Sequence, residues 1–156
     1  MRTYILPRTV APAHSYVNDV RITRDGNHAI LTDSTVGGLN VIDLKTGAAR
    51  KLLATHPSTH AEAGVITTVE GQKMYLAGTT PALPATFQSD GLAILGGWVY
   101  YHAVTARTLY KIKAAVLTDP RKTPEEVAGA VEIVTTSGIH DGMVRMIYFG
   151  THVHIW

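Results

Sequence analysis

The chain of 156 residues contains no cysteine, which excludes disulfide bonds, thiolate metal sites and cysteine nucleophiles. It also lacks any apolar run near the roughly 18–20 residues of a membrane-spanning helix, so no membrane partner is expected. A strong charge of either sign is missing too. The 14 lysines and arginines are scattered and nearly balanced by 12 aspartates and glutamates, so no nucleic-acid partner is expected.

The start of the chain does not have the pattern of an export signal, because Pro7 and Arg8 interrupt the apolar segment that such a signal needs. The sequence therefore leaves the cellular location open. Its composition, 46% hydrophobic and 17% charged, excludes a disordered chain. Together with the length, this composition indicates one folded domain, 1–156.

Apolar residues recur along most of the chain with a period of two, which is typical of β-strands. The first four expected strands form an antiparallel meander, because turn sequences around Gly26, Gly37 and Gly47 separate them. A hairpin is expected around Glu70-Gly71-Gln72. The expected strands are 20–22, 28–33, 39–44, 50–53, 65–69, 73–77, 91–95, 98–101, 108–112, 143–149 and 153–156.

One short helix is expected near 124–134. Thr123 is a good N-cap, Pro124 suits the first helical position, and Glu126 completes a capping box. Three valines, Val127, Val131 and Val134, would then lie on one face of the helix.

An internal repeat is the most informative feature of the sequence. Three units, beginning at Asn18, Ser89 and His140, each place an aspartate second and continue with an apolar strand, a turn and a second strand. Blades of β-propellers have about 40–50 residues and four strands, so the units predict an all-β fold of about three antiparallel four-stranded blades. The expected blades are roughly 14–64, 65–117 and 131–156, the long first interval including an inserted hairpin or loop.

Three blades form only a half-ring, because propellers close with about 4–8 blades. A half-ring leaves unpaired strand edges. Three outcomes are open: the chain is a fragment of a longer propeller, copies self-associate to complete the ring, or the sheets close in another way.

The run from Leu6 to Leu53, with HPSTHAE, SDGLAI, VYYHAVTARTLYKIKAAVLTDP and EEVAGAVE, resembles the Yellow / major royal jelly protein family over about residues 2–135. The resemblance implies part of a six-bladed propeller that binds a ligand in its central channel. It extends more distantly to gluconolactonase-like propellers, whose channel holds a divalent metal. Family members are often secreted.

The sequence departs from the family in three ways. Its opening is similar to the middle of a family member, so about half the propeller is expected to be absent. The final stretch keeps Asp141-Gly142 but then shortens, and the export signal common in the family is missing.

The leading candidate site consists of Asn18, Asp19, Asp90 and Asp141, which recur at the starts of the expected innermost strands. These side chains are expected to share a polar cavity, where oxygen ligands can bind Ca²⁺ or another divalent cation, or pair with an ammonium group. The metal set would be Asn18, Asp90 and Asp141. The structural alternative is that these residues accept backbone hydrogen bonds at turns.

Other features have weaker functional interpretations. His56 with His60, and His140 with His152 and His154, have spacings that can bind Zn²⁺ or Ni²⁺, but a solvated loop and a chain end are the simpler explanation and are favoured. Tyr101 is the aromatic candidate for ligand contact, although aromatic residues in strands usually pack between sheets. Thr32-Asp33-Ser34 has no nucleophile motif around it and is interpreted as a strand end.

Two functions of different classes follow. The first, implied by the resemblance, is a module that binds a small aromatic or amine ligand, with Asp19 or Asp90 pairing the ammonium group and a tyrosine stacking on the ring. The second is a metal-dependent lactone hydrolase, in which Asn18, Asp90 and Asp141 hold the cation. A fragment without activity of its own is a third possibility. No catalytic residue is assigned.

Overall fold

The computed structural model describes residues 2–136, and these residues form a mostly β structure of antiparallel sheets. The prediction of an all-β fold class is thereby confirmed. The expected strands 143–149 and 153–156, and the residues Asp141, His140, His152 and His154, lie outside the described part.

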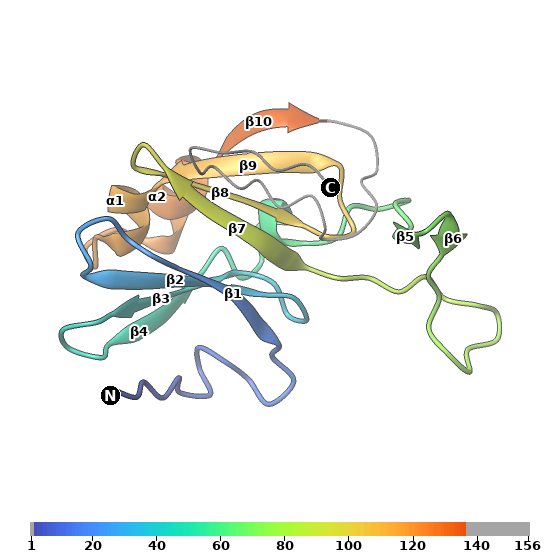
Figure 1. The fold of residues 1–156 in the computed structure, drawn as a ribbon, viewed down its shortest axis with the longest axis horizontal. Helices are drawn as coiled ribbons and strands as arrows, with labels where there is room; N and C mark the ends of the chain where they lie inside the picture. The colour runs from blue at the N-terminus through green and yellow to red at the C-terminus, as the bar shows by residue number, and fades with distance from the viewer. Residues whose placement is uncertain (1, 137–156) are drawn as a thin grey trace.

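Two four-stranded meanders make up the body of the molecule (Figure 1). In each, the strands follow one another in chain order. Tight turns connect them, as the sequence predicts, except that residues 114–131 precede the last strand of the C-terminal sheet. The N-terminal sheet contains β1 (Val17–Ile22), β2 (His28–Asp33), β3 (Leu39–Asp43) and β4 (Ala49–Leu52). The C-terminal sheet contains β7 (Ser89–Leu95), β8 (Trp98–Ala103), β9 (Thr108–Lys113) and β10 (Glu132–Thr136).

The turns of the first meander have the chemistry that their sequences predict. Gly37 and Gly47 have φ values of +75° and +81°, a region in which a side chain would be strained. The Asp43 carboxylate accepts hydrogen bonds of 2.8 Å from the N–H groups of Lys45 and Thr46. This Asx-type turn reverses the chain between β3 and β4.

The two sheets share one apolar core. Leu39 and Val41 of the N-terminal sheet belong to the same buried cluster as Val99, Tyr101 and Ile112 of the C-terminal sheet. A fully buried side chain of this size stabilises the fold by about 1.5–3 kcal/mol. Because strand residues alternate between faces, the period of two in the sequence provides each sheet with its core-facing side chains.

A long insertion connects the two sheets. It contains a short 3-10 helix, η1 (Pro57–Thr59), and a hairpin of β5 (Thr68–Val69) and β6 (Gln72–Lys73). Figure 1 shows the hairpin and the loop after it projecting from the body, at the end away from the helices. The expected hairpin around Gly71 is therefore present, with shorter strands than the sequence predicts.

Two short helices, α1 (Ala114–Thr118) and α2 (Pro124–Gly129), cover one end of the sheets (Figure 1). Their buried residues Leu117 and Val127 join the core. The capping box of Thr123 and Glu126 is confirmed. Neither helix is long and apolar enough to cross a membrane, nor is any other helix within residues 2–136.

The extent of the expected helix at 124–134 was wrong. Helix α2 ends at Gly129, and Glu132–Thr136 forms strand β10 instead. Glycine is a poor helix former, and the β-branched run Ile133-Val134-Thr135-Thr136 favours a strand. Strand β10 pairs with β9, so it completes the C-terminal sheet, whereas the sequence assigned this segment to a third unit.

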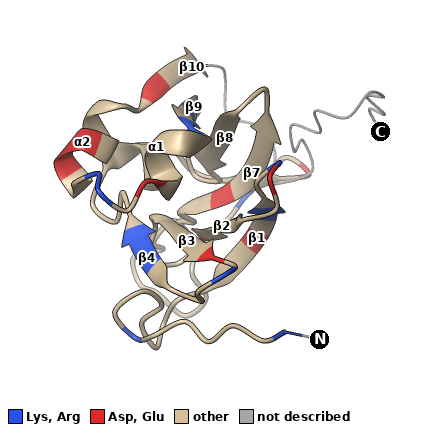
Figure 2. Ribbon diagram, turned by 90° about the vertical axis from the view of Figure 1, so that its left-hand side faces the viewer, with Lys and Arg blue, Asp and Glu red and all other residues tan. Residues whose placement is uncertain are grey.

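Charged residues do not gather by sign in the view of Figure 2, where basic and acidic segments are interspersed over both sheets. This distribution agrees with the small net charge of +2. Any charged site must therefore be local.

Candidate functional site

The first strand of each sheet, β1 or β7, carries a β-bulge at the predicted site residues. In β1 the register shifts between Val17 and Val20, so Asn18 and Asp19 together oppose a single partner residue. In β7 it shifts between Ser89 and Leu92, at Asp90 and Gly91. Bulges redirect side chains and are common beside functional sites.

The two bulges also correct the alignment of the repeat. Counting from the last paired residue before each shift, Asn18 occupies in β1 the place that Asp90 occupies in β7. The alignment of the repeat units by sequence instead makes Asp19 the equivalent of Asp90, because both are aspartates. The structural equivalence shows that an amide and a carboxylate occupy corresponding places on neighbouring strands.

Asn18 and Asp90 meet directly. The Asn18 side-chain amide donates a hydrogen bond of 2.5 Å to Asp90 Oδ1 and one of 3.2 Å to Ser34 Oγ. The Ser34 hydroxyl in turn donates to Asp90 Oδ2 at 2.8 Å. The Thr32 hydroxyl, on β2 of the N-terminal sheet, donates to the Asp90 carbonyl oxygen at 2.8 Å. These bonds join the first two strands of the N-terminal sheet to β7 around one carboxylate.

Three of the four residues in this network, Asn18, Ser34 and Asp90, line a pocket of about 660 Å³. Such a volume is in the range of small-molecule sites, which are usually apolar with a few placed polar groups. The hydroxyl-bearing residues Thr35 and Thr67 also contribute to the lining. The apolar part of the lining comes from five side chains: Tyr16, Val69, Met74, Phe87 and Val104.

The electrostatics of Asp90 are unusual for an aspartate in a protein. The residue is only 4% exposed. Burial raises the pKa of Asp90 above its ordinary value of 3.8, and the Asp19 carboxylate adds to the rise, although hydrogen bonds from Ser34 and Asn18 and the charge of His102 oppose it. A nearby cation would stabilise the charged form of such a buried carboxylate.

The structure gives Asp19 a different role. Its carboxylate forms an ion pair of 3.5 Å with Arg21, two residues along the same strand. Its N–H group donates to Thr32 Oγ1 at 3.1 Å. Asp19 is not among the residues that line the pocket, so its influence on Asp90 is through charge.

Tyr101 lies in the core between the sheets, apart from the residues that line the pocket. It is fully buried, its hydroxyl is 2.9 Å from Ser58 Oγ, and its ring stacks on Tyr110 with centroids 6.1 Å apart. Burial strongly raises the pKa of Tyr101. The arrangement is the packing that aromatic residues in strands usually adopt.

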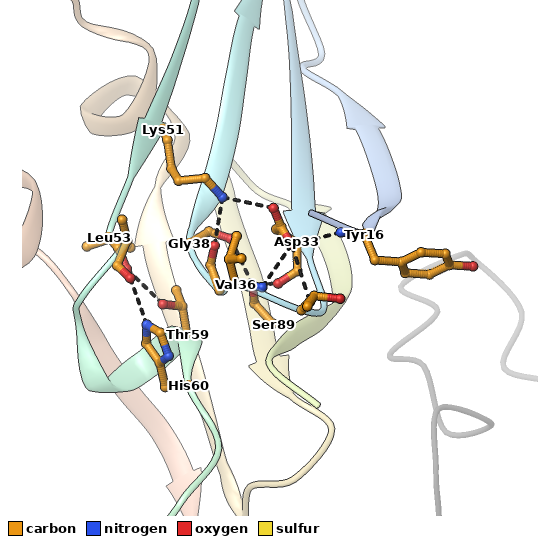
Figure 3. Close-up of polar contacts among 12 residues, drawn as sticks. Tyr16, Asp33, Val36, Gly38, Lys51, Leu53, Thr59, His60 and Ser89 are labelled. Atoms are coloured by element: carbon orange, nitrogen blue, oxygen red, sulfur yellow. Dashed lines mark hydrogen bonds and ion pairs between the residues drawn. The ribbon is translucent and has the colours of Figure 1, made fainter. Parts of the chain in front are cut away.

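A second buried carboxylate, Asp33 at the end of β2, has a side chain with no exposed surface. Figure 3 shows its polar contacts. Its Oδ2 is 3.0 Å from Lys51 Nζ. Its Oδ1 accepts bonds of 3.2 Å from Tyr16 N–H and 3.1 Å from Val36 N–H. Lys51 also donates to the Gly37 carbonyl oxygen at 2.8 Å, so the ion pair holds the chain segment between β2 and β3.

The environment of Asp33 favours its charged form. Burial opposes ionisation, but the nearby Ser15 hydroxyl, the Val36 N–H group and the Lys51 ammonium outweigh it, so the pKa of Asp33 lies below its ordinary value of 3.8. Asp33 is therefore a structural residue, as the interpretation of Thr32-Asp33-Ser34 as a strand end predicts. Its neighbour Ser34 belongs to the pocket.

The loop histidines are tied into backbone caps. His56 Nδ1 accepts from the Ser58 N–H group at 3.2 Å, at the start of η1. His60 Nε2 donates to the Ala54 carbonyl oxygen at 2.7 Å, and its ring fills the space beside Gly37. Within residues 2–136, no group of three or more histidine, aspartate or glutamate side chains is placed to hold a metal ion. Of the predicted metal set, the structure describes Asn18 and Asp90 and brings them together.

The sequence did not reveal most of the pocket. Ser34, Thr67, Met74 and Phe87 have no motif around them, and only the three-dimensional arrangement brings them to Asp90. Comparison of the sequence with protein-family models and with curated proteins finds no match.

Proposed function

We propose that this chain is a binding module for a small organic cation with an aromatic body, and that Asp90 is the anionic anchor of the site. One observation carries the proposal. A nearly buried carboxylate, bonded among the described residues only to the neutral groups of Asn18 and Ser34, lines a pocket whose walls are otherwise largely apolar.

The hydrogen-bonding capacity of Asp90 supports this proposal. An ionised carboxylate has about four lone-pair sites. The bonds from Asn18 and Ser34 use one site on each oxygen. An ammonium or guanidinium group in the pocket would take the sites that remain and would also neutralise a charge that burial makes costly.

The apolar lining favours a ligand with a flat hydrophobic part. Tyr16 and Phe87 offer aromatic faces, on which a ring can stack or a cation can rest. Val69, Met74 and Val104 add aliphatic and thioether surface. A ligand with one cationic end and one ring matches both halves of this lining.

The fold that we propose is part of a propeller of the Yellow / major royal jelly type. Two adjacent four-stranded meanders that share a core, each with a bulge at the equivalent place of its innermost strand, support this proposal. The pocket at the bulges would then belong to the central channel.

We also propose that copies of the chain self-associate. Val20 and Ile22, on the innermost strand of the N-terminal sheet, are 47% and 52% exposed, and apolar surface of this kind is commonly covered by a partner. Light scattering coupled to size exclusion tests this: a mass of two or more chains is expected, and a monodisperse mass of one chain would contradict it.

Isothermal titration calorimetry with 2-phenylethylamine tests the binding function. The uncharged isostere 2-phenylethanol is the matched ligand control. We expect the amine to bind and the alcohol to bind about 10- to 100-fold more weakly, the range expected for losing a hydrogen bond to a charged group.

Two variants locate the site. Asp90→Asn should weaken amine binding by about 10- to 100-fold. Asp19→Asn removes a carboxylate that is already paired with Arg21 and does not line the pocket, so it should change the affinity by about twofold or less. Equal affinity for amine and alcohol, or equal loss in both variants, would overturn the proposed function.

A further inference from the structure

The residues that line the pocket come from two parts of the chain, the four-stranded sheets and the hairpin segment between them. Asn18, Ser34 and Asp90 come from β1, from the end of β2 and from β7, which belong to the sheets. Thr67, Val69 and Met74 come from the hairpin segment inserted between the sheets. The polar anchor and part of the apolar wall are thus on independent structural elements.

The base of the hairpin is fixed to the body by a buried pair of hydroxyls. Thr67 Oγ1 lies 2.7 Å from Thr105 Oγ1, and both residues are at most 1% exposed. Thr105 Oγ1 also accepts a bond of 2.9 Å from the Phe87 N–H group. Thr67, before the hairpin, and Phe87, at the end of the loop after it, therefore meet at Thr105, in the turn between β8 and β9.

Met74 is held from both sides of its backbone. Its N–H group donates to the Thr67 carbonyl oxygen at 2.9 Å, and its carbonyl oxygen accepts from the Ala85 N–H group at 3.0 Å. The side chain is half-buried and lines the pocket. By contrast, Leu83 on the same segment is 51% exposed and is not among the lining residues.

We propose that Val69 and Met74 are the specificity-determining residues of the pocket, and that they select the size of the ring that a cationic ligand carries. This inference rests on the proposed function. The anchor at Asp90 is shared by all cations of this class, whereas the hairpin side chains contact only the apolar end. Methionine is well suited to such a wall, because its thioether adapts its shape and makes favourable contacts with aromatic ring edges.

The experiment compares two ligands that differ only in ring size, 2-phenylethylamine and 2-(1-naphthyl)ethylamine. Calorimetry gives the ratio of their affinities for the unmodified chain and for three variants. Met74→Ala removes volume from the wall and should shift the ratio toward the naphthyl ligand by about tenfold, the scale of size discrimination in apolar pockets. Val69→Phe adds volume and should shift the ratio the opposite way.

Leu83→Ala, in the loop after the hairpin, is the matched control and should leave the ratio of affinities within about twofold, as expected for a surface substitution away from the site. Opposite shifts in Met74→Ala and Val69→Phe with no shift in Leu83→Ala would support the inference. Unchanged ratios in both pocket variants, with amine binding that still depends on Asp90, would overturn the inference alone. Absence of binding by either amine to the unmodified chain would overturn the proposed function and the inference with it.

Discussion

Two buried aspartates, Asp33 and Asp90, differ in what surrounds them. Asp33, at the end of β2, is fully enclosed, with the Lys51 ammonium and backbone N–H groups as partners. Asp90, on β7, is 4% exposed and lines the pocket, and the described side chains that donate to it, Asn18 and Ser34, are neutral.

The pKa values of the two carboxyl groups move in opposite directions as a result. The pKa of Asp33 is lowered and that of Asp90 is raised from the same ordinary value of 3.8. Burial opposes the charged form of both carboxylates. At Asp33 the Ser15 hydroxyl, the Val36 N–H group and the Lys51 ammonium together outweigh burial, whereas at Asp90 the neutral donors Ser34 and Asn18 do not.

The largest effect on stability is expected when the buried ion pair between Asp33 and Lys51 is broken. Asp33→Ala leaves the Lys51 ammonium and several backbone N–H groups without their acceptor. Breaking a buried ion pair costs about 3–5 kcal/mol, so the free energy of unfolding measured with urea should fall by that amount. A loss of less than about 1 kcal/mol would place this pair with surface ion pairs of little effect.

An intermediate effect on stability is expected at Ser34, whose hydroxyl donates to Asp90. Ser34→Ala removes the 2.8 Å bond to Asp90 Oδ2 and should lower the free energy of unfolding by about 1–2 kcal/mol. It should also raise the pKa of Asp90 further, because the hydroxyl lowers that pKa in the unmodified chain. Carboxyl NMR titration of Asp90 checks the direction, and a lowered pKa would contradict the role of Ser34 as donor.

The smallest expected effect on stability, that of Asp90→Asn, has the opposite sign. Because folding raises the pKa of Asp90, the protonated carboxyl group favours the folded state and the ionised group opposes it. This contribution to the free energy of unfolding is fully present below pH 3.8 and is lost as the pH rises through the pKa of the folded state. Asp90→Asn should therefore match the unmodified chain in stability at low pH. At neutral pH it should be as stable as the unmodified chain or more stable, because asparagine carries no charge to bury.

Thermal unfolding from pH 3 to pH 7 measures this difference. The corresponding test at Asp33 has the reverse sign, because a lowered folded pKa gives stability that is lost as the pH falls. A clear destabilisation by Asp90→Asn at neutral pH would show that Asp90, like Asp33, is a structural residue.

The sequence was sufficient for local features of the fold. The turns at Gly37 and Gly47 and the capping box at Thr123 depend on neighbouring residues, and all three are where the sequence predicts them. The end of helix α2 was not predicted correctly. There, the strand partner β9, which is distant in sequence, favours an extended conformation of the β-branched run after Gly129.

The candidate site was only partly predictable. Asn18 and Asp90 stood out because they recur in the repeat, and the structure joins them. The bulges, which make Asn18 and not Asp19 the equivalent of Asp90, depend on pairing between strands. Ser34 and Met74 reach the pocket through contacts with segments far along the chain, so no local pattern marks them.

One NMR experiment tests the contrast between the two aspartates most directly. The side-chain carboxyl signals of Asp33 and Asp90 are followed against pH, with and without saturating 2-phenylethylamine. Without the amine, Asp33 should titrate below 3.8 and Asp90 above it. With the amine, the pKa of Asp90 should fall while that of Asp33 stays unchanged. An Asp90 pKa that is not raised, or that does not move when the amine is added, would contradict the assignment of Asp90 as the anchor for an external cation.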